Sequence, residues 1–298
     1  MRYNWHCIVG FLDALRARVW LADGAMGTRL FAKGIAPGRC LEELNLSLPA
    51  LVREIHNEYR AAGAEILTTN TFGANAARLA AHGLEDFCYA INTAGVRLAR
   101  EAAGAEGWVA GSVGPLGVNT LCNAREIFLA QIEALADAGA DMIMLETFRD
   151  LKEIHEAILA AREACDLPLI GLVSPDDEGR LADGSAPELY AIQLADWGAD
   201  VIGGNCGTGP QSIVASIQRM AVTVTAPLAA KPSAGLPTRR DGADCYPCSP
   251  QDLAQITIDL VHNGVRILGG CCGTTPEHIR AMREAIASVA AGRWARST

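Results

Sequence analysis

Three cysteines stand where apolar segments of the chain end. Cys271 and Cys272 are adjacent and follow the segment VRILGG, and Cys206 closes the similar segment ADVIGGNC. Zn²⁺ binds thiolates readily, and a catalytic zinc site uses three protein ligands and keeps its fourth position open. Neighbouring side chains of a strand point to opposite faces, but flanking glycines permit backbone angles at which both sulfurs can face one ion. The three cysteines therefore predict a zinc site, whereas the adjacent pair alone would fit two unrelated buried thiols equally well.

Carboxylates stand at the ends of two further segments, Asp23 in RVWLADGA and Glu146 in ADMIMLETF. Such a pair can carry out acid–base chemistry or hold the ammonium group of a substrate. The backbone amides of residues 25–27 begin a predicted helix and suit a substrate carboxylate. Together these groups predict a site for an amino acid. The expected substrate-binding residues are Asp23, Gly24, Met26, Gly27, Thr69, Asn70, Glu146 and Asn205.

Lys231 offers a different chemistry. It ends the segment APLAAK, and a lysine at the end of a barrel strand can form a Schiff base with a carbonyl substrate, as in aldolases. A lysine-dependent aldolase is therefore the main competing prediction. The histidines fall outside the strand ends, which counts against a histidine-rich metal site.

Cys245 and Cys248 form a CxxC motif. This spacing resembles a redox site or half of a zinc ribbon. The chain has no second CxxC, and the next predicted helix begins only after Cys248. We therefore expect no functional role for this pair, and a non-catalytic zinc or redox protein stays as an alternative function.

The composition limits the class of protein. The chain has 298 residues, half of them hydrophobic, and a formal net charge of −9. Without a block of lysine and arginine, this charge argues against binding to nucleic acid or to an anionic membrane surface. No apolar run approaches the roughly 18 residues of a membrane span, and the N-terminal CIVGFL is too short for a signal peptide. We therefore expect a soluble, cytoplasmic protein.

Eight short apolar segments alternate with amphipathic ones. They are rich in Val, Ile, Leu and Ala without strict alternation, which is typical of strands buried on both faces of a parallel sheet. Eight such units predict an α/β fold of the (β/α)₈ or TIM-barrel type, with the active site at the C-terminal ends of the strands. A doubly wound open sheet is the alternative. The segments are 18–25, 64–73, 107–115, 140–148, 167–174, 199–207, 226–235 and 265–273.

Helical patterns lie between the apolar segments, and the clearest occupy residues 49–64, 125–140, 150–164 and 249–264. Ser249 is the expected N-cap of the last one. Gly63, Gly139, Gly198 and Gly264 are expected just past helix ends, because glycine tolerates a left-handed backbone. We expect a single domain over residues 1–298, with an N-terminal extension at 1–17 that forms a helix and a C-terminal tail at 287–298.

Seven segments between residues 20 and 286 match those of a known family in the same order: LADGAMGT, ILTTNTFGAN, AGSVGP, AGADMIMLETF, GGNCGTGP, KPSAGLP and GGCCGTTPEHI. In them the chain resembles the homocysteine S-methyltransferases. This family includes betaine–homocysteine methyltransferase and the homocysteine domain of cobalamin-dependent methionine synthase. The resemblance implies one homocysteine-binding zinc barrel in which Cys206, Cys271 and Cys272 hold the ion. It also implies that Asp23 and Glu146 contact the amino group of homocysteine.

The implied reaction transfers a methyl group to the thiol of L-homocysteine and forms L-methionine. A free thiol has a pKa near 8.5, and Zn²⁺ would take the homocysteine sulfur at its open position and deprotonate it. The three cysteines are catalytic in this sense, and the barrel supplies positioning. Methyl transfer to another thiol or selenol, within a multi-component system, is an alternative on the same site.

The methyl donor is left open. The segment LGVNTLCNAREIF is shorter than is usual in the family, at a place where loops shape the donor side. We expect no folate-binding, cobalamin-binding or reductase domain after Thr298. The expected partners are therefore small molecules, namely homocysteine and a donor. The candidate donors are S-methylmethionine, S-adenosylmethionine, a betaine-type onium compound, or methyl-cobalamin carried by a separate corrinoid protein.

Overall fold

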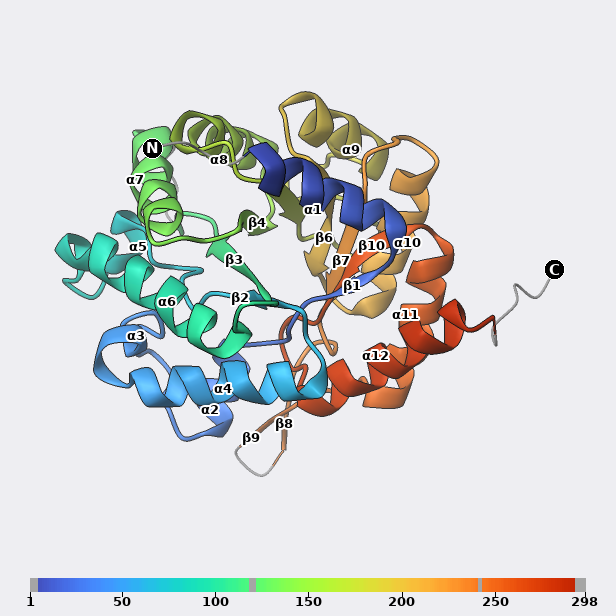
Figure 1. The fold of residues 1–298 in the computed structure, drawn as a ribbon, viewed down its shortest axis with the longest axis horizontal. Coiled ribbons are helices and arrows are strands. Elements are labelled where there is room, and N and C mark those ends of the chain that lie inside the picture. The colour runs from blue at the N-terminus through green and yellow to red at the C-terminus, as the bar shows by residue number, and fades with distance from the viewer. Residues whose placement is uncertain (1–4, 118–121, 241–242, 293–298) are drawn as a thin grey trace.

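Eight parallel strands form a barrel in the computed structural model of the chain, which describes residues 5–117, 122–240 and 243–292 (Figure 1). The strands neighbour one another in the order β1-β10-β7-β6-β5-β4-β3-β2, and a bridge between Ala22 and Ile66 joins the two ends of this series. The predicted (β/α)₈ barrel is confirmed, and each predicted apolar segment contains one strand. The strands are β1 (Trp20–Leu21), β2 (Ile66–Thr68), β3 (Trp108–Val113), β4 (Met142–Phe148), β5 (Leu169–Val173), β6 (Val201–Cys206), β7 (Leu228–Pro232) and β10 (Val265–Leu268).

Helices surround the barrel (Figure 1). Ser249 caps α11 as predicted, because its side chain accepts a hydrogen bond from the amide of Asp252. None of the helices among the described residues is both long enough and apolar enough to cross a membrane. The helices are α1 (Trp5–Ala17), α2 (Gly27–Ala32), α3 (Leu44–Ser47), α4 (Pro49–Ala62), α5 (Ala76–Ala80), a 3₁₀ helix (Glu85–Phe87), α6 (Cys88–Ala103), α7 (Ala124–Asp137), α8 (Leu151–Ala164), α9 (Pro187–Asp196), α10 (Pro210–Ala221), α11 (Pro250–His262) and α12 (Pro276–Ala290).

The N-terminal helix α1 lies across the end of the barrel at which the strands begin (Figure 1). Phe11 and Leu15 are fully buried and pack against side chains from the strands. The ring of Phe11 lies 5.1 Å from that of Trp108 and 6.4 Å from that of Trp20, measured between centroids. The N-terminal extension therefore covers the end of the barrel at which the strands begin, and the opposite end, where the strands finish, stays available for the site.

Two features of the chain differ from the expected outline. A short hairpin of β8 (Thr238–Arg240) and β9 (Ala243–Cys245) follows β7, and the sequence patterns did not predict it. The expected tail at 287–298 begins inside α12, which continues to Ala290, and residues 293–298 lie outside the described residues.

His56 makes the stability of the barrel depend on pH. Its ring is fully buried in α4, and neither ring nitrogen has a hydrogen-bond partner among the described residues. Burial lowers the pKa of His56 from 6.5 to about 4. The stability that the neutral ring contributes is therefore complete above pH 6.5 and is lost as the pH falls toward 4.

The expected loss between pH 6.5 and pH 4 is about 3 kcal/mol in the free energy of unfolding. Urea unfolding across this range should show a flatter dependence on pH in His56→Leu than in the wild type. His82 is exposed, so His82→Leu should retain the wild-type dependence and serves as the control. Equal slopes for His56→Leu and the wild type would contradict the assignment.

Candidate active site

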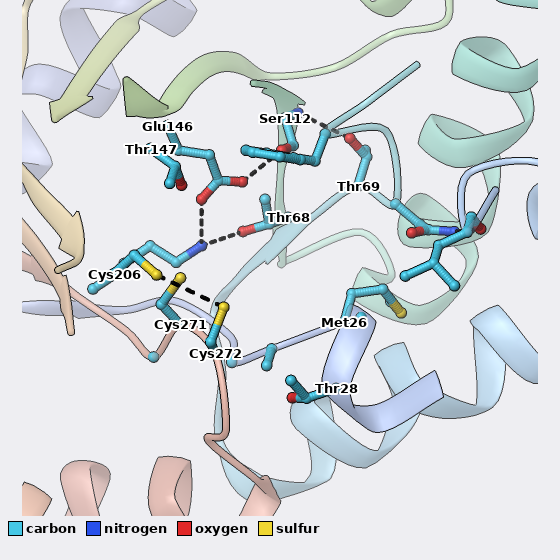
Figure 2. Close-up of a pocket in the computed structure, with 18 of the residues that line it drawn as sticks. Met26, Thr28, Thr68, Thr69, Ser112, Glu146, Thr147, Cys206, Cys271 and Cys272 are labelled. Atoms are coloured by element: carbon cyan, nitrogen blue, oxygen red, sulfur yellow. Dashed lines mark hydrogen bonds and ion pairs between the residues drawn. The ribbon is translucent and has the colours of Figure 1, made fainter. Parts of the chain in front are cut away.

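Three thiols meet at the C-terminal ends of the strands, as predicted. The sulfurs of Cys206, Cys271 and Cys272 all lie within 4.8 Å of one another, and those of Cys206 and Cys272 are 3.7 Å apart (Figure 2). Cys206 is the last residue of β6, and the adjacent pair follows β10. Because β7 separates these two strands in the barrel, the thiols reach each other across one intervening strand.

The backbone around the thiols explains how two adjacent cysteines serve one site. β10 ends at Leu268, so the alternation of side chains stops before Cys271. A Cβ atom on Gly269 would lie 2.9 Å from the carbonyl oxygen of Asp23, and only glycine permits that close approach. Cys206 itself has a φ of +60°, a left-handed conformation that non-glycine residues rarely adopt. Such backbone angles persist where the surrounding structure fixes them, and they cluster at functional sites.

The donor set fits a thiophilic metal ion. A tetrahedral ion with sulfur ligands at about 2.3 Å separates them by about 3.8 Å, close to the 3.7 Å between Cys206 and Cys272. Hydrogen bonds from Cys206 and Cys271 lower the pKa of Cys272, and the same contacts raise the pKa of Cys206. The cluster thus favours one thiolate by itself, and a divalent cation would supply the charge that lets all three ionise.

A cavity of about 350 Å³ opens beside the thiols (Figure 2). Nine of the expected substrate-binding or metal-binding residues line it. Its outer wall is formed by apolar side chains and by Glu42, whose carboxylate accepts a hydrogen bond of 2.7 Å from the amide of Gly73. The expected residues that line it are Gly24, Met26, Gly27, Thr69, Asn70, Glu146, Cys206, Cys271 and Cys272.

Two expected substrate-binding residues lie behind the cavity wall. Asp23 is 2% exposed and accepts hydrogen bonds of 2.7 Å from both the amide and the hydroxyl of Thr68. Asn205 is fully buried, and its side-chain amide makes two hydrogen bonds of 2.7 Å to Thr147. Among the backbone amides, that of Ala25 donates to the hydroxyl of Thr274 at 3.2 Å. Asp23 and Asn205 are therefore placed to hold other side chains rather than to line the cavity.

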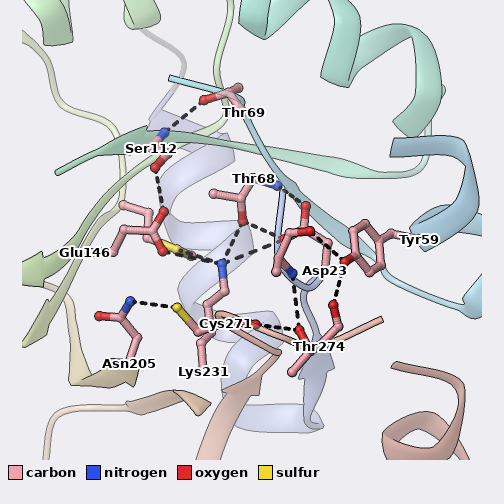
Figure 3. Close-up of polar contacts among 12 residues, drawn as sticks. Asp23, Tyr59, Thr68, Thr69, Ser112, Glu146, Asn205, Lys231, Cys271 and Thr274 are labelled. Atoms are coloured by element: carbon pink, nitrogen blue, oxygen red, sulfur yellow. Dashed lines mark hydrogen bonds and ion pairs between the residues drawn. The ribbon is translucent and has the colours of Figure 1, made fainter. Parts of the chain in front are cut away.

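Asn205 contacts the group of three thiols. Its side-chain nitrogen lies 3.7 Å from the sulfur of Cys271 (Figure 3). Its contacts with Thr147 also fix a β-branched residue in a left-handed conformation, with a φ of +67°. This backbone conformation costs roughly 1–3 kcal/mol, so the two hydrogen bonds hold the end of β4 against β6.

Replacing Asn205 with alanine should weaken zinc binding by about 10–100-fold, the usual effect of losing a side chain that orients a ligand. Competition against a chromophoric chelator measures this affinity. Asn263→Ala is the matched control, since the side chain of Asn263 donates a hydrogen bond to the carbonyl of Asp259 at the end of α11, away from the thiols. Equal zinc affinity in the two variants would show that Asn205 does not position Cys271.

Lys231 lies at the centre of a buried charged group. Its ammonium nitrogen is 2.9 Å from the hydroxyl of Thr68, 3.7 Å from Asp23 and 3.6 Å from Glu146 (Figure 3). Burial alone would lower the pKa of Lys231, but the carboxylates of Glu146 and Asp23 outweigh it and raise the pKa. Schiff-base chemistry requires a neutral amine, which enzymes obtain by lowering the lysine pKa. The geometry therefore argues against the aldolase alternative.

The CxxC pair lies outside the thiol group. Cys245 ends β9 and is exposed, and both Cys245 and Cys248 are free thiols. Burial raises the pKa of Cys248 to about 11, whereas a redox-active thiol needs a lowered pKa. The expectation of no catalytic role is consistent with this environment.

Several cavity residues were not predicted from the sequence. Ser112 and Thr147 stand at strand ends, so the rule that identified Glu146 could have found them. The apolar wall comes from loops, where an apolar residue has no distinctive pattern in a single sequence. The unpredicted lining residues are Thr28, Phe31, Leu41, Glu42, Thr68, Phe72, Ser112, Thr147 and Gly270.

The fold and the site define a class of protein: a TIM barrel that carries three thiols, able to bind a metal ion, beside a cavity at the C-terminal ends of its strands. Residues 20–286 match the family described as Homocysteine S-methyltransferase. The chain belongs to this family, and the resemblance inferred from its motifs is confirmed.

Two named relatives and one solved structure agree with this family assignment. The chain is 32% identical over 302 residues to methionine synthase from Mycobacterium tuberculosis and 31% identical over 300 residues to that from Mycobacterium leprae. Each match covers 93% of this chain and 25% of the synthase, so the chain spans about a quarter of their length. The metallated crystal structure of the homocysteine methyltransferase MmuM from Escherichia coli superposes with a TM-score of 0.78 at 29% identity, covering 92% of this chain and 99% of MmuM.

Proposed function

We propose that the chain is a zinc-dependent S-methyltransferase that transfers a methyl group to the thiol of L-homocysteine and forms L-methionine. The observation that carries this proposal is the group of three thiols within 4.8 Å of one another at the edge of a cavity that Glu146 also lines. The family and the likeness to MmuM support homocysteine as the acceptor, and the metallated form of MmuM supports a bound metal.

Cys206, Cys271 and Cys272 would hold the ion. When bound there, Zn²⁺ would accept the substrate thiol at its fourth position and lower its pKa, so that the thiolate forms near neutral pH. Cys206 ends β6 and the adjacent pair follows β10, and a rigid barrel fixes the distance between the ends of its strands. This chain's contribution is thus to keep three sulfurs converged on one point of the cavity wall.

The remaining groups would orient the amino-acid part of homocysteine. The carboxylate of Glu146 faces the cavity and would accept a hydrogen bond from the substrate ammonium group. The amides of Met26 and Gly27, which border the cavity, are proposed to hold the substrate carboxylate. Held at both ends, the substrate presents its sulfur toward the methyl donor, and such positioning supplies a large part of the rate enhancement.

Methyl transfer itself requires no general base from the chain. A bond forms between the substrate sulfur and the methyl carbon while the bond from that carbon to the donor breaks. The donor would approach along the apolar wall that contains Phe31, Leu41 and Phe72. Water would be largely excluded from a cavity of this lining once both substrates are bound.

The test is a panel of methyl donors with L-homocysteine and the zinc-loaded chain, scored for methionine by mass spectrometry. The donors are S-methylmethionine, S-adenosylmethionine, betaine and a methyl-cobalamin protein. Methionine formation that depends on zinc supports the proposal and identifies the donor. A zinc-loaded chain that methylates cysteine or a selenol, and not homocysteine, would contradict the acceptor.

A further inference from the structure

A buried cation that the reaction does not use as a nucleophile lies beside the proposed ammonium site. The side chain of Lys231 is 3% exposed and forms ion pairs of 3.7 Å and 3.6 Å with Asp23 and Glu146. We propose that Lys231 is an internal counter-ion, a positioning residue that makes this buried group complementary to an acceptor carrying one ammonium group. This inference rests on the proposed function, since it explains how the same site recognises its acceptor.

Asp23 contributes charge to this group without touching the substrate. Its side chain does not border the cavity, and both of its oxygens already accept hydrogen bonds from Thr68 (Figure 3). The hydroxyl of Thr68 in turn accepts a hydrogen bond of 2.9 Å from Lys231. Burial raises the pKa of Asp23 to about 6, so the carboxylate is ionised at pH 7.5. Asp23, Thr68 and Lys231 thus form a connected unit at the cavity wall, in which Thr68 and Lys231 line the cavity and Asp23 lies behind them.

Glu146 is the carboxylate of the group that lines the cavity, where Lys231 also lies, whereas Asp23 does not line it. One carboxylate oxygen accepts a hydrogen bond from the hydroxyl of Ser112. The other lies 3.6 Å from the nitrogen of Lys231, which is too long for a hydrogen bond. Glu146 lines the cavity, and a substrate ammonium group is the donor that would complete the hydrogen bonding of this carboxylate.

The charges of the three side chains determine which acceptor fits. Two carboxylates and one ammonium leave one negative charge without a partner in the group. A buried unpaired charge is unfavourable, and one substrate ammonium group removes it. A thiol without an amino group leaves the charge unpaired. In the absence of Lys231, two negative charges would stand there, and one substrate ammonium group could not balance them.

Two thiols of matched length test the selectivity of the wild-type chain. 3-Mercaptopropylamine has the thiol and the ammonium group, and 4-mercaptobutanoate has the thiol and the carboxylate of homocysteine without its ammonium group. Isothermal titration calorimetry of the zinc-loaded chain at pH 7.5 should show that homocysteine binds at least about tenfold more tightly than 4-mercaptobutanoate. 3-Mercaptopropylamine should also bind more tightly than 4-mercaptobutanoate. Equal affinities for the three thiols would overturn the inference. The contact between the metal and the thiol is common to all three ligands, so it does not contribute to the difference in affinity.

Two variants test the role of Lys231 itself. Asp23→Asn keeps the shape of the side chain and leaves Lys231 and Glu146 as a neutral pair, so the preference for homocysteine over 4-mercaptobutanoate should fall about tenfold. The double variant Asp23→Asn with Lys231→Met again leaves one unpaired carboxylate, Glu146, and should restore the preference to within about threefold of the wild type. If the double variant showed no greater preference for homocysteine over 4-mercaptobutanoate than Asp23→Asn does, the inference would be overturned.

A control variant separates charge from packing. Met144 lies 3.7 Å from the nitrogen of Lys231, so Met144→Leu disturbs the packing around the lysine and changes no charge. Its preference for homocysteine over 4-mercaptobutanoate should equal that of the wild type. A loss of preference as large as in Asp23→Asn would show that packing, and not charge, causes the selectivity, and would overturn the inference. Binding is measured without a methyl donor. A chain that discriminates in this way and yet forms no methionine would therefore refute the proposed reaction and leave the inference standing.

Discussion

Replacing Cys271 with alanine should yield a folded chain that binds almost no zinc and forms no methionine. The variant retains Cys206 and Cys272, two of the three thiols that lie within 4.8 Å of one another. Its zinc affinity should fall by more than the roughly 10–100-fold that loss of an orienting side chain costs, because a ligand itself is removed. Zinc per chain, measured by mass spectrometry after dialysis against a chelator, tests this beside the rate of methionine formation.

The fold should survive this change, because the barrel does not depend on the metal. Small metal-binding domains unfold without their ion, since they bury few apolar side chains. Here a continuous core of buried Leu, Ile, Val and Ala connects the strands and helices, and Cys271 lies past the end of β10 at the edge of the cavity. The circular dichroism spectrum of Cys271→Ala should therefore match that of the wild type.

Two further variants make the result specific. Cys245→Ala removes an exposed free thiol from the neighbouring hairpin and should keep wild-type zinc and activity. Cys206→Ser replaces sulfur with the poorer oxygen ligand at nearly equal size and should lose zinc as Cys271→Ala does. Full zinc and activity in either Cys206→Ser or Cys271→Ala would refute the ligand set. Loss of zinc with retained activity would refute the zinc-dependent reaction.

The fold could be predicted from local patterns because each pattern has a local physical cause. Segments such as ADMIMLETF are apolar without alternation because both faces of a barrel strand are buried, as all but one residue of β4 are. Gly63 has a φ of +109° just past α4, the conformation for which glycine is favoured. The hairpin of β8 and β9 contributes no strand to the barrel, so the repeat of eight apolar segments does not indicate it.

The site could be predicted only in part. Cys206, Cys271, Cys272 and Glu146 were identified because a parallel barrel brings its strand ends together, whatever the sequence between them. The same rule placed Asp23 in contact with substrate. In the structure the side chain of Asp23 does not line the cavity and accepts hydrogen bonds from Thr68, and such a partner depends on side-chain contacts between separate strands. A single sequence therefore shows which residues reach this end of the barrel, and the structure shows which of them face the cavity.

The N-terminal helix leads to the second large expected effect. Replacing Phe11 with alanine should lower the free energy of unfolding by about 3–5 kcal/mol, as truncation of a fully buried phenylalanine does. The ring of Phe11 is fully buried and contacts the rings of Trp20 and Trp108 at the starts of β1 and β3. In a chain of this size the thermal midpoint should fall by roughly ten degrees. Calorimetry and urea unfolding measure the two quantities.

The matched control lies on the same helix. Asp13 is exposed, and its ion pair with Arg16 is solvent-exposed as well, so Asp13→Ala should change the free energy of unfolding by less than about 0.5 kcal/mol. Zinc content should be unchanged in both variants, because α1 covers the end of the barrel opposite the thiols. If Phe11→Ala were as stable as Asp13→Ala, α1 would not pack against the barrel floor. If Phe11→Ala lost zinc while still folded, the packing of α1 at this end of the barrel would be coupled to the metal-binding thiols at the other end. The helix would then contribute to the site as well as to stability.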